Sequence, residues 1–385
     1  MTIDQRVSPD QSGVVMRRMD LKRRDLLRVV VVGGGIGGAE LLRNAATKEG
    51  LELVLVEPKD RIECQALYPD YLGGEIGVEE MTAPLDPFCR RMGAAHLRDR
   101  ALRVDFADRR VTCEKNDLDY DILVLVPGAV QNYFGVEGAE KAFTINTLEE
   151  TVRARRFIER ARPERIAVIG SGPTGVETVC FLAARTGSKI SIVEMMDRLL
   201  PTLSKNSSIL MEKILSGKGV EVLTGKRVSS IREGGVAFAD GTSLDCEMTI
   251  WTAGIRPAPL IEGLDLPKKK GWLLTDQYLR VQGREDVFAF GDGAWIEIDG
   301  KLATKTGMEA EIQAKHTARN LARLARGAPL KPYSVRASTD SPVALISTGC
   351  GCAVGIYGDL CVPIPKRIIY TFKSWIDKSF VKRFK

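Results

Sequence analysis

The chain has 385 residues, of which 44% are hydrophobic and 28% charged, so its composition is that of an ordinary globular protein. No apolar run approaches the ~20 residues that a membrane-spanning helix requires, which excludes a transmembrane pump. The formal net charge is +6, and residues 366–385 alone hold seven basic side chains and one acid. The whole positive surplus therefore lies in this C-terminal segment.

Residues 1–28 are polar and contain two pairs of adjacent arginines, and we predict a flexible N-terminal tail there. The eight cysteines are too sparse for a secreted disulfide framework, and no apolar signal-peptide core precedes them. These features predict a protein of the reducing cytoplasm.

The first organised segment predicts a strand, a tight turn and a helix. A run of four valines leads into the pattern G-x-G-x-x-G at Gly33, Gly35 and Gly38. Such glycines permit the turn, let a pyrophosphate approach the backbone, and let the helix pack closely on the strand. A second apolar strand, 51–56, ends in Glu57, nineteen residues after Gly38, where a carboxylate can bind ribose hydroxyls.

The same unit recurs in the middle of the chain. An apolar run at 165–169 precedes Gly170, Gly172 and Gly175, and the following apolar run ends in Glu194, again nineteen residues after the last glycine. Two loops, each with its strands and its acid, predict two dinucleotide sites. A carboxylate at Glu194 would repel the 2′-phosphate of NADPH, which favours NADH.

With these loops the sequence resembles the two-dinucleotide flavoproteins of the pyridine-nucleotide-dependent reductase superfamily, over residues 28–325. Three further segments match the pattern of that superfamily, and they contain Gly128, Gly254 and the pair Gly291 and Asp292. The resemblance implies FAD at the first loop and NADH at the second, with Asp292 on the ribityl chain. The implied FAD residues are Gly33, Gly35, Gly38, Glu57, Gly128, Gly291 and Asp292. The implied NADH residues are Gly170, Gly172, Gly175, Glu194 and Gly254.

The order of the motifs predicts an α/β fold with two Rossmann-like dinucleotide-binding domains, one inserted in the other. The predicted FAD-binding domain comprises residues 29–150 and 256–330, and the NADH-binding domain residues 151–255. Residues 331–385 are predicted to form a C-terminal membrane-associating region, with a strand or hairpin from about 342–346 and a final amphipathic helix.

Further motifs indicate which member of the superfamily the chain resembles. Disulfide reductases carry a C-x-x-x-x-C pair near the flavin, whereas this chain has only Cys64 there, which we interpret as a free buried cysteine. The short remainder of the chain is typical of membrane-associated quinone reductases. The segment from Gly170 to Glu177 resembles type II NADH:quinone oxidoreductases, while the segment from Lys305 to Met308 resembles sulfide:quinone oxidoreductases.

The first resemblance implies a flavin-dependent oxidoreductase that passes two electrons from NADH through FAD to a membrane quinone, without proton pumping. Three residues are the candidates for catalysis. Glu177 would order the nicotinamide side or relay a proton. Lys305 and Thr306, at a helix N-terminus beside the flavin, would stabilise its anionic reduced form.

Two alternatives stay open. A sulfide:quinone oxidoreductase needs two cysteines across the flavin; Cys350 or Cys352 lies about where the second occurs, while Thr174 stands where the first is expected. An NADH-sensing flavoprotein would instead bind a partner or nucleic acid through the basic tail. Apolar residues interleave with the basic ones, so we expect a membrane and no nucleic acid. Zinc needs four ligands and the chain has two histidines, so we expect no metal.

The segment 364–385 predicts an amphipathic helix in the plane of the membrane interface. Its apolar residues recur at spacings of three and four, which places them on one face, and they are Ile368, Ile369, Phe372, Trp375, Ile376 and Phe380. The basic residues expected to meet anionic headgroups are Lys366, Arg367, Lys373, Lys378, Lys382 and Arg383. We therefore expect a peripheral protein on the cytoplasmic face of the cell membrane, and we allow for a homodimer.

Overall fold

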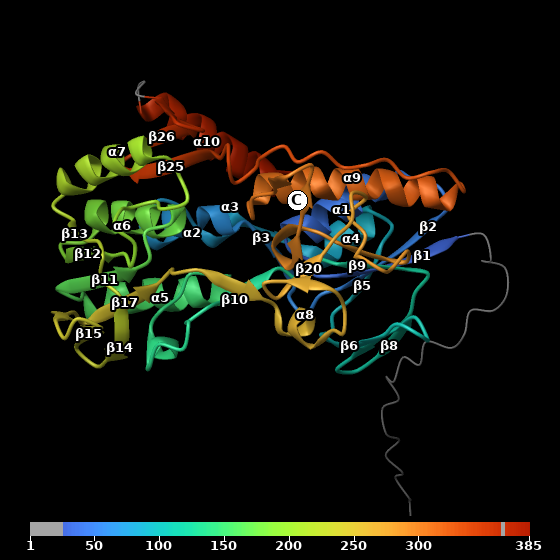
Figure 1. Cartoon of the computed structure of the whole chain (residues 1–385), viewed down its shortest axis with the longest axis horizontal. Coiled ribbons are helices and arrows are strands. Elements are labelled where there is room, and N and C mark those ends of the chain that lie inside the picture. Colours follow the sequence, from blue (N-terminus) through green and yellow to red (C-terminus); the bar gives the residue numbers. More distant parts are fainter. Residues whose placement is uncertain (1–25, 363–365) are drawn as a thin grey trace, which may run out of the picture.

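The computed structural model describes residues 26–362 and 366–385 (Figure 1). The predicted flexibility of residues 1–25 lies outside the described residues. The boundary of that tail at residue 28 is wrong, because strand β1 (Leu27–Val32) already includes Leu27, which pairs with Leu51. Within the described ranges, no helix has both the length and the apolar character needed to cross a membrane.

The first sheet has five parallel strands in the order β21-β9-β1-β2-β5. Their bounds are β1 as above, β2 (Leu51–Val56), β5 (Ala95–Leu97), β9 (Ile122–Leu125) and β21 (Val287–Ala289). The valines of β1 are buried on both faces of the sheet, as β-branched residues in a parallel sheet usually are. Helices α1 (Ile36–Ala45) and α9 (Gly307–Ala325) pack against one another over this sheet.

The second sheet has four parallel strands in the order β13-β12-β11-β17, with a core of its own. The strands are β11 (Arg165–Ile169), β12 (Lys189–Val193), β13 (Glu221–Leu223) and β17 (Met248–Trp251). The helices around it are α5 (Leu148–Ala161), α6 (Pro173–Arg185) and α7 (Lys205–Ser216), and a small antiparallel sheet joins β14 (Val228–Arg232), β15 (Gly235–Phe238) and β16 (Ser243–Asp245).

The two sheets are connected by a pair of neighbouring strands, β10 (Ala129–Gln131) and β18 (Ile255–Pro257), which run antiparallel. The chain leaves the first unit through β10, builds the second sheet, and returns through β18. Because β21 follows this return and joins the first sheet, that sheet contains strands from both sides of the insertion. The arrangement is the α/β fold expected from the sequence, while the domain boundaries stay a prediction.

The other elements are short: β3 (Arg61–Glu63), η1 (Gln65–Leu67), α2 (Tyr68–Leu72), α3 (Val78–Met81), β4 (Thr82–Pro84), α4 (Leu85–Arg91), β6 (Ala101–Asp105), β7 (Arg110–Cys113), β8 (Asp117–Asp119), η2 (Ala139–Lys141), α8 (Pro259–Gly263), β19 (Lys268–Lys269), β20 (Trp272–Leu274), η3 (Gly291–Gly293), β22 (Ala294–Trp295), β23 (Glu297–Ile298) and β24 (Lys301–Leu302).

The C-terminal region contains the predicted hairpin and the predicted helix. Strands β25 (Val343–Gly349), β26 (Cys352–Tyr357) and β27 (Leu360–Val362) form an antiparallel sheet that lies against α6. Helix α10 (Lys366–Lys382) packs on β26, and Phe380 and Phe384 at its end enter the core of the first sheet. In Figure 1, α10 and α9 follow one another along the upper edge of the molecule.

The predicted single apolar face of the C-terminal helix is divided in the structure. Phe380 is buried, and Ile369 and Ile376 are half-buried, so these three side chains are not free to enter a membrane as expected. Ile368, Phe372 and Trp375 remain 66%, 55% and 64% exposed. The spacing correctly places these apolar residues on one side of the helix, but other parts of the protein cover three of the six.

Several of the basic residues assigned to lipid headgroups are also engaged within the protein. Lys373 is only 7% exposed, which contradicts the prediction for that residue. Lys378 forms an ion pair with Glu80, and Arg383 with Glu311. Arg367 and Lys382 are exposed as expected, and the side chain of Lys366 lies outside the described part of the chain.

Candidate functional site

The first glycine loop has the shape that a bound pyrophosphate requires. Gly33 has φ +113°, and a Cβ there would lie 2.2 Å from the Val126 carbonyl oxygen. A Cβ on Gly38 would lie 1.9 Å from the Gly33 carbonyl oxygen, so both positions demand glycine. Gly35 caps α1 without a side-chain hydrogen bond and faces open space, which leaves the N-terminus of the helix available to phosphate.

Glu57 lies at the end of β2, beside this loop. Its carboxylate accepts hydrogen bonds from the backbone N–H of Gly34, at 2.7 Å, and from that of Lys59, at 3.0 Å. These bonds fix the carboxylate next to the turn, the place where the ribose of a dinucleotide binds in this motif.

Residues distant in sequence meet at the same loop. A Cβ on Gly307, at the start of α9, would lie 3.2 Å from Ile36 Cδ1 in α1. The Gln313 side chain accepts a hydrogen bond from Gly291 N at 2.8 Å, which holds Asp292 near the start of α9. Gly128 has φ +73° and faces open space, close to Gly293. The structure therefore brings together the segments expected to hold FAD.

Lys305 lies beside these segments and is hydrogen-bonded to their backbone. Its ammonium donates to the carbonyl oxygens of Asp292 and Ala294, at 3.0 and 2.6 Å, and lies 3.9 Å from the centre of the Trp272 ring. Burial lowers the pKa of Lys305 to about 8, while Asp292 opposes the shift. Burial raises the pKa of Asp292, and Lys305 opposes that shift. The exposed Thr306 caps α9 by accepting from Glu309 N.

The second loop repeats the geometry of the first. A Cβ on Gly170 would lie 2.7 Å from the Ala253 backbone, and one on Gly175 would lie 2.0 Å from the Gly170 carbonyl oxygen. Gly172 caps α6 with open space around it and no side-chain hydrogen bond. Gly254, φ +86°, lies just beyond Ala253, so the loop and this turn share one edge of the second sheet.

Glu194 follows strand β12 beside the second loop, as Glu57 follows β2 beside the first. It is buried, and its carboxylate accepts from Ser171 N, Ser171 Oγ and Met196 N at 3.0, 2.7 and 2.9 Å. These three donors hold the carboxylate in one orientation beside the loop.

Glu177 lies in a buried cluster of charged groups that reaches across the molecule. It projects from α6, accepts from Ser347 N of β25 at 2.7 Å, and lies 3.4 Å from Lys373 Nζ of α10. Lys373 Nζ also lies 3.1 Å from Asp377. Burial raises the pKa of Glu177 and Lys373 opposes the shift; burial lowers the pKa of Lys373, but Glu177 and Asp377 outweigh it and raise the value.

Asp70 completes this cluster, which we call the α10 charge cluster: Asp70, Glu177, Tyr370, Lys373 and Asp377. Asp70 is buried in α2 and accepts from Tyr370 OH at 3.3 Å, while its Oδ2 has no hydrogen-bond partner. Sequence reasoning missed all of its members except Glu177. The signal was present, because Asp377 is the one acid in the basic segment and stands four residues after Lys373, the spacing of a helical ion pair.

The charge cluster predicts how stability depends on pH. Burial raises the pKa of Asp70 to about 7, well above the ~3.9 of an unfolded chain. From about pH 4 to 7 the folded protein then keeps a proton that the unfolded chain has lost, so stability falls as pH rises through that window.

Asp70→Asn removes this titration while keeping the side chain neutral. We expect the free energy of unfolding of the variant, relative to the unmodified protein, to increase from pH 4.5 to pH 8 in urea denaturation. Parallel pH profiles for the two proteins would contradict the assignment.

No disulfide joins the cysteines within the described residues. All eight are free, and no group of three or more potential metal ligands occurs among the residues described. Cys64 is a free, buried cysteine as expected, and burial raises the pKa of its thiol to about 12. Cys350 is exposed in a turn beside α6, where a Cβ on Gly349 would lie 2.7 Å from the Cys180 carbonyl oxygen.

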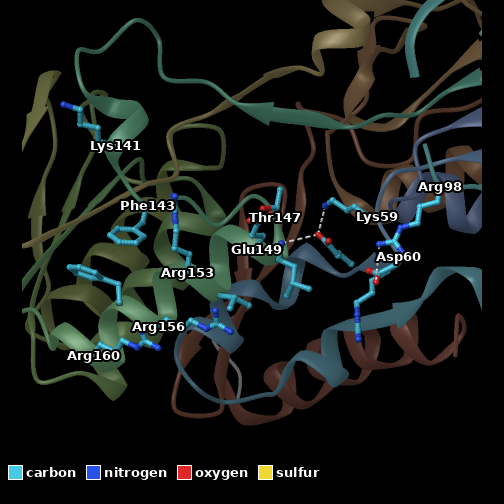
Figure 2. Close-up of a pocket in the computed structure, with 15 residues that line it drawn as sticks. Lys59, Asp60, Arg98, Lys141, Phe143, Thr147, Glu149, Arg153, Arg156 and Arg160 are labelled. Atoms are coloured by element: carbon cyan, nitrogen blue, oxygen red, sulfur yellow. Dashed lines mark hydrogen bonds and ion pairs between the residues drawn. The ribbon is translucent and has the colours of Figure 1, made fainter. Parts of the chain in front are cut away.

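A groove of about 910 Å³ separates the two units on the side of α5 and β3 (Figure 2). None of the glycine loops, Glu57 or Glu194 lines it. Several of its charges are already paired, including Lys59 with Glu63 at 2.9 Å and Arg98 with Asp60 at 3.7 Å. The dinucleotide loops and this groove are therefore separate features.

Two parallel sheets, each with a glycine turn, an uncapped helix N-terminus and a fixed carboxylate, define a protein with two dinucleotide-binding units. The chain belongs to the pyridine nucleotide-disulphide oxidoreductase family, whose match covers residues 27–320.

The chain is similar to curated quinone reductases. It is 26% identical over 337 residues to the type II NADH:quinone oxidoreductase of Staphylococcus epidermidis, covering 79% of this chain and 84% of the relative. It is 28% identical over 330 residues to a demethylphylloquinone reductase of Synechocystis, covering 79% and 81%. It is also 25% identical to external alternative NAD(P)H-ubiquinone oxidoreductase B2 of Arabidopsis thaliana, over 70% of this chain but only 54% of that protein's length.

Solved structures share the fold. The sulfide:quinone oxidoreductase of Aquifex aeolicus superposes with a TM-score of 0.81 at 18% identity, covering 93% of this chain and 91% of the other. NDH2 of Plasmodium falciparum superposes with a TM-score of 0.77, also at 18% identity, covering 93% and 98%. At this level of identity the likeness shows the fold alone.

Proposed function

We propose that this protein is a type II NADH:quinone oxidoreductase that passes two electrons from NADH, through FAD, to a quinone without pumping protons. The observation that carries the proposal is the second loop, intact with its glycines and its buried acid Glu194, in a chain similar to curated NADH:quinone oxidoreductases. A cofactor fits the first loop, because Gly35 and Gly128 face open space and α1 is uncapped. FAD, when bound there, supplies the two-electron carrier between NADH and quinone.

The FAD-binding roles follow from this geometry. The N-terminus of α1 with Gly35 would hold the pyrophosphate, while Gly33 and Gly38 permit the turn and the close packing of the helix on the strand. Glu57 would bind the adenosine ribose. Asp292, with Gly291 and Gly128 beside it, would bind the ribityl chain. These segments belong to the proposed FAD-binding domain, 29–150 and 256–330.

The NADH-binding roles use the second loop in the same way. Gly172 and the N-terminus of α6 would hold the pyrophosphate of NADH, while Gly170 and Gly175 permit the turn and the close packing of the helix. Glu194 would bind the ribose. Gly254 forms the neighbouring turn, where a Cβ would lie 3.0 Å from the Phe134 ring. These residues belong to the proposed NADH-binding domain, 151–255.

For the chemistry, we assign a proton-carrying role to Glu177. Its pKa, raised by burial, lets its carboxyl group hold a proton, and the Lys373 ammonium at 3.4 Å favours the carboxylate once that proton has left. Lys305 contributes a positive charge at the base of the α9 N-terminus that Thr306 caps, which favours a negative charge on a group bound there.

We further propose that the protein is peripheral on the cytoplasmic face of the membrane. The exposed apolar residues of α10 are supplemented by Tyr357 and Leu360 of the adjoining hairpin, each 64% exposed. A surface of this kind suits the lipid interface, where the quinone is dissolved. A homodimer remains part of the hypothesis, and the engagement of Lys378 and Arg383 in ion pairs disfavours nucleic-acid binding through this segment.

The function is tested by anaerobic titration of the purified protein with NADH, NADPH and sulfide in turn, following the flavin absorbance. We expect bleaching by NADH, much weaker bleaching by NADPH, and none by sulfide.

Replacing Cys350 and Cys352 by serine should leave the rate of NADH-driven quinone reduction within several-fold of that of the unmodified protein, since this route needs no thiol. Bleaching by sulfide that disappears in the double variant would instead establish the sulfide:quinone alternative.

The selection of NADH over NADPH is expected to depend on Glu194. Glu194→Gln removes the charge, so the preference, measured as the ratio of the two kcat/KM values, should narrow by about tenfold. Glu221→Gln on the neighbouring strand β13 is the matched control and should leave the ratio unchanged. An unaltered ratio in Glu194→Gln would show that discrimination lies elsewhere.

A further inference from the structure

A hollow of about 410 Å³ lies at the far end of α9, away from both dinucleotide loops. Arg319, which lines it, follows the helix cap Thr306 by thirteen residues, or about 20 Å along the helix axis. The hollow is therefore distinct from the site described above. Its volume is within the range of small-molecule sites.

Every charged side chain that lines this hollow is basic, and we call the set the α9 basic cluster: Lys48, Arg319, Arg323, Arg326 and Lys331. No carboxylate lines it, and none of the five makes an ion pair within 4.0 Å in the part of the chain that the structure describes. Five cations around one small volume repel one another and create a strongly positive potential. A bound anion would offset that repulsion.

The cluster is not accounted for by the dipole of α9 alone. Cations near a helix C-terminus are favourable, and Arg323 and Arg326 lie there. Arg319, however, lies more than a turn and a half before the end of the helix, while Lys48 follows α1 and Lys331 belongs to the loop after α9. Three separate segments thus deliver cations to one place.

Hydrogen bonds hold two of these segments together, α9 and the loop that follows it. Asn320 is 0% exposed; its side chain accepts from Lys331 N and donates to Lys331 O, both at 3.0 Å, which ties the loop to α9. Arg323 donates to the Pro329 carbonyl oxygen. Asn320 also contacts His316 Nε2 at 3.1 Å, which places the imidazole in the wall of the hollow. The backbone of the loop is therefore fixed against α9 beside the hollow.

The groove in Figure 2 provides a contrast. It is larger, but Asp60, Glu63 and Glu149 line it, and two of them pair with its cations. The hollow beside α9 is lined by no acidic residue that could pair with its cations. Arginine presents a planar fork that matches phosphate oxygens, and three of the five residues are arginines.

We propose that the α9 basic cluster is a binding site for a phosphate group, separate from the two dinucleotide sites. The phosphate is carried either by a small soluble molecule or by an anionic lipid headgroup, and the chemistry of recognition is the same for both. The proposal does not depend on quinone reduction.

The experiment uses the holoprotein with ¹³C-labelled histidine, because the chain contains only two histidines and their signals are readily separated. Inorganic phosphate and pyrophosphate are titrated at constant ionic strength set by chloride. We expect saturable movement of the His316 signal and no movement of that of His96, which is held by Asp86 and the Glu57 carbonyl oxygen. Arg319→Ala/Arg326→Ala should weaken binding by about tenfold or more, because each removes charged hydrogen bonds.

The matched control is Arg156→Ala/Arg160→Ala on α5, which removes two exposed arginines that likewise make no ion pair within the described residues. A second arm measures co-sedimentation with neutral vesicles containing or lacking phosphatidic acid. Binding of soluble phosphate that is lost only in the α9 variant supports a soluble ligand. Phosphatidic-acid-dependent sedimentation lost only in that variant supports a lipid headgroup. If neither the His316 signal nor sedimentation distinguishes the α9 variant from the control, the proposal is overturned.

Discussion

Lys373→Met is expected to lower the free energy of unfolding by about 3–5 kcal/mol near neutral pH, because it removes the cation that lies between the buried Glu177 and the half-buried Asp377. Lys373 lies at 3.4 and 3.1 Å from these two groups and is 7% exposed, so water cannot replace it. The measurement is urea denaturation of the holoprotein at pH 7.

Lys378→Met is the matched control, since it removes the same charge from the same helix. Its ion pair with Glu80 is well exposed, and such pairs contribute about 0–1 kcal/mol. The loss of stability in Lys373→Met should also shrink at pH 5, because Glu177, whose pKa is raised by burial, can hold a proton there. Equal losses for the two variants would mean that the α10 charge cluster does not stabilise the fold as its geometry indicates.

Replacing Ile368, Phe372 and Trp375 together by serine is expected to abolish most binding to anionic vesicles. Burial of each large apolar side chain contributes about 1.5–3 kcal/mol, so even partial insertion of three of them should change the partition coefficient by well over tenfold. Because the three side chains are exposed, the substitutions should leave the fold intact. Co-sedimentation at low salt measures the effect.

The control for this variant replaces Leu102 and Ile209 by serine. These two side chains lie on other elements and are 53% and 58% exposed. It should sediment like the unmodified protein. If the unmodified protein itself stays in the supernatant with anionic vesicles, or if the α10 variant sediments equally well, the proposed membrane surface is wrong and α10 serves another interface.

The two glycine loops could be predicted from sequence because their requirements are local. A Cβ at Gly33, Gly38, Gly170 or Gly175 would collide with the loop's own backbone or with the strand beside it, so the residue types carry the geometry with them. The insertion of the second sheet followed from the order of the motifs for the same reason.

The C-terminal helix could be predicted only in part. Helical periodicity tells which residues share a face, but not whether lipid or protein covers that face. Ile369 and Phe380 share a stripe with Ile368 and Phe372, and only tertiary packing separates them. Lys373 was assigned to headgroups because no local signal shows that Glu177, nearly 200 residues earlier, meets it in space.

The pairing of β10 with β18 has a consequence for how such a chain can change over evolutionary time. Gln131 and Ile255 are partners across the ladder, so the two ends of everything between them are one strand spacing apart, about 4.8 Å. A gene segment encoding that portion can lengthen, shorten or be exchanged without re-routing the first sheet. These two positions are accordingly natural junctions for chimaeras in which the inserted second sheet and its helices are exchanged for another such unit.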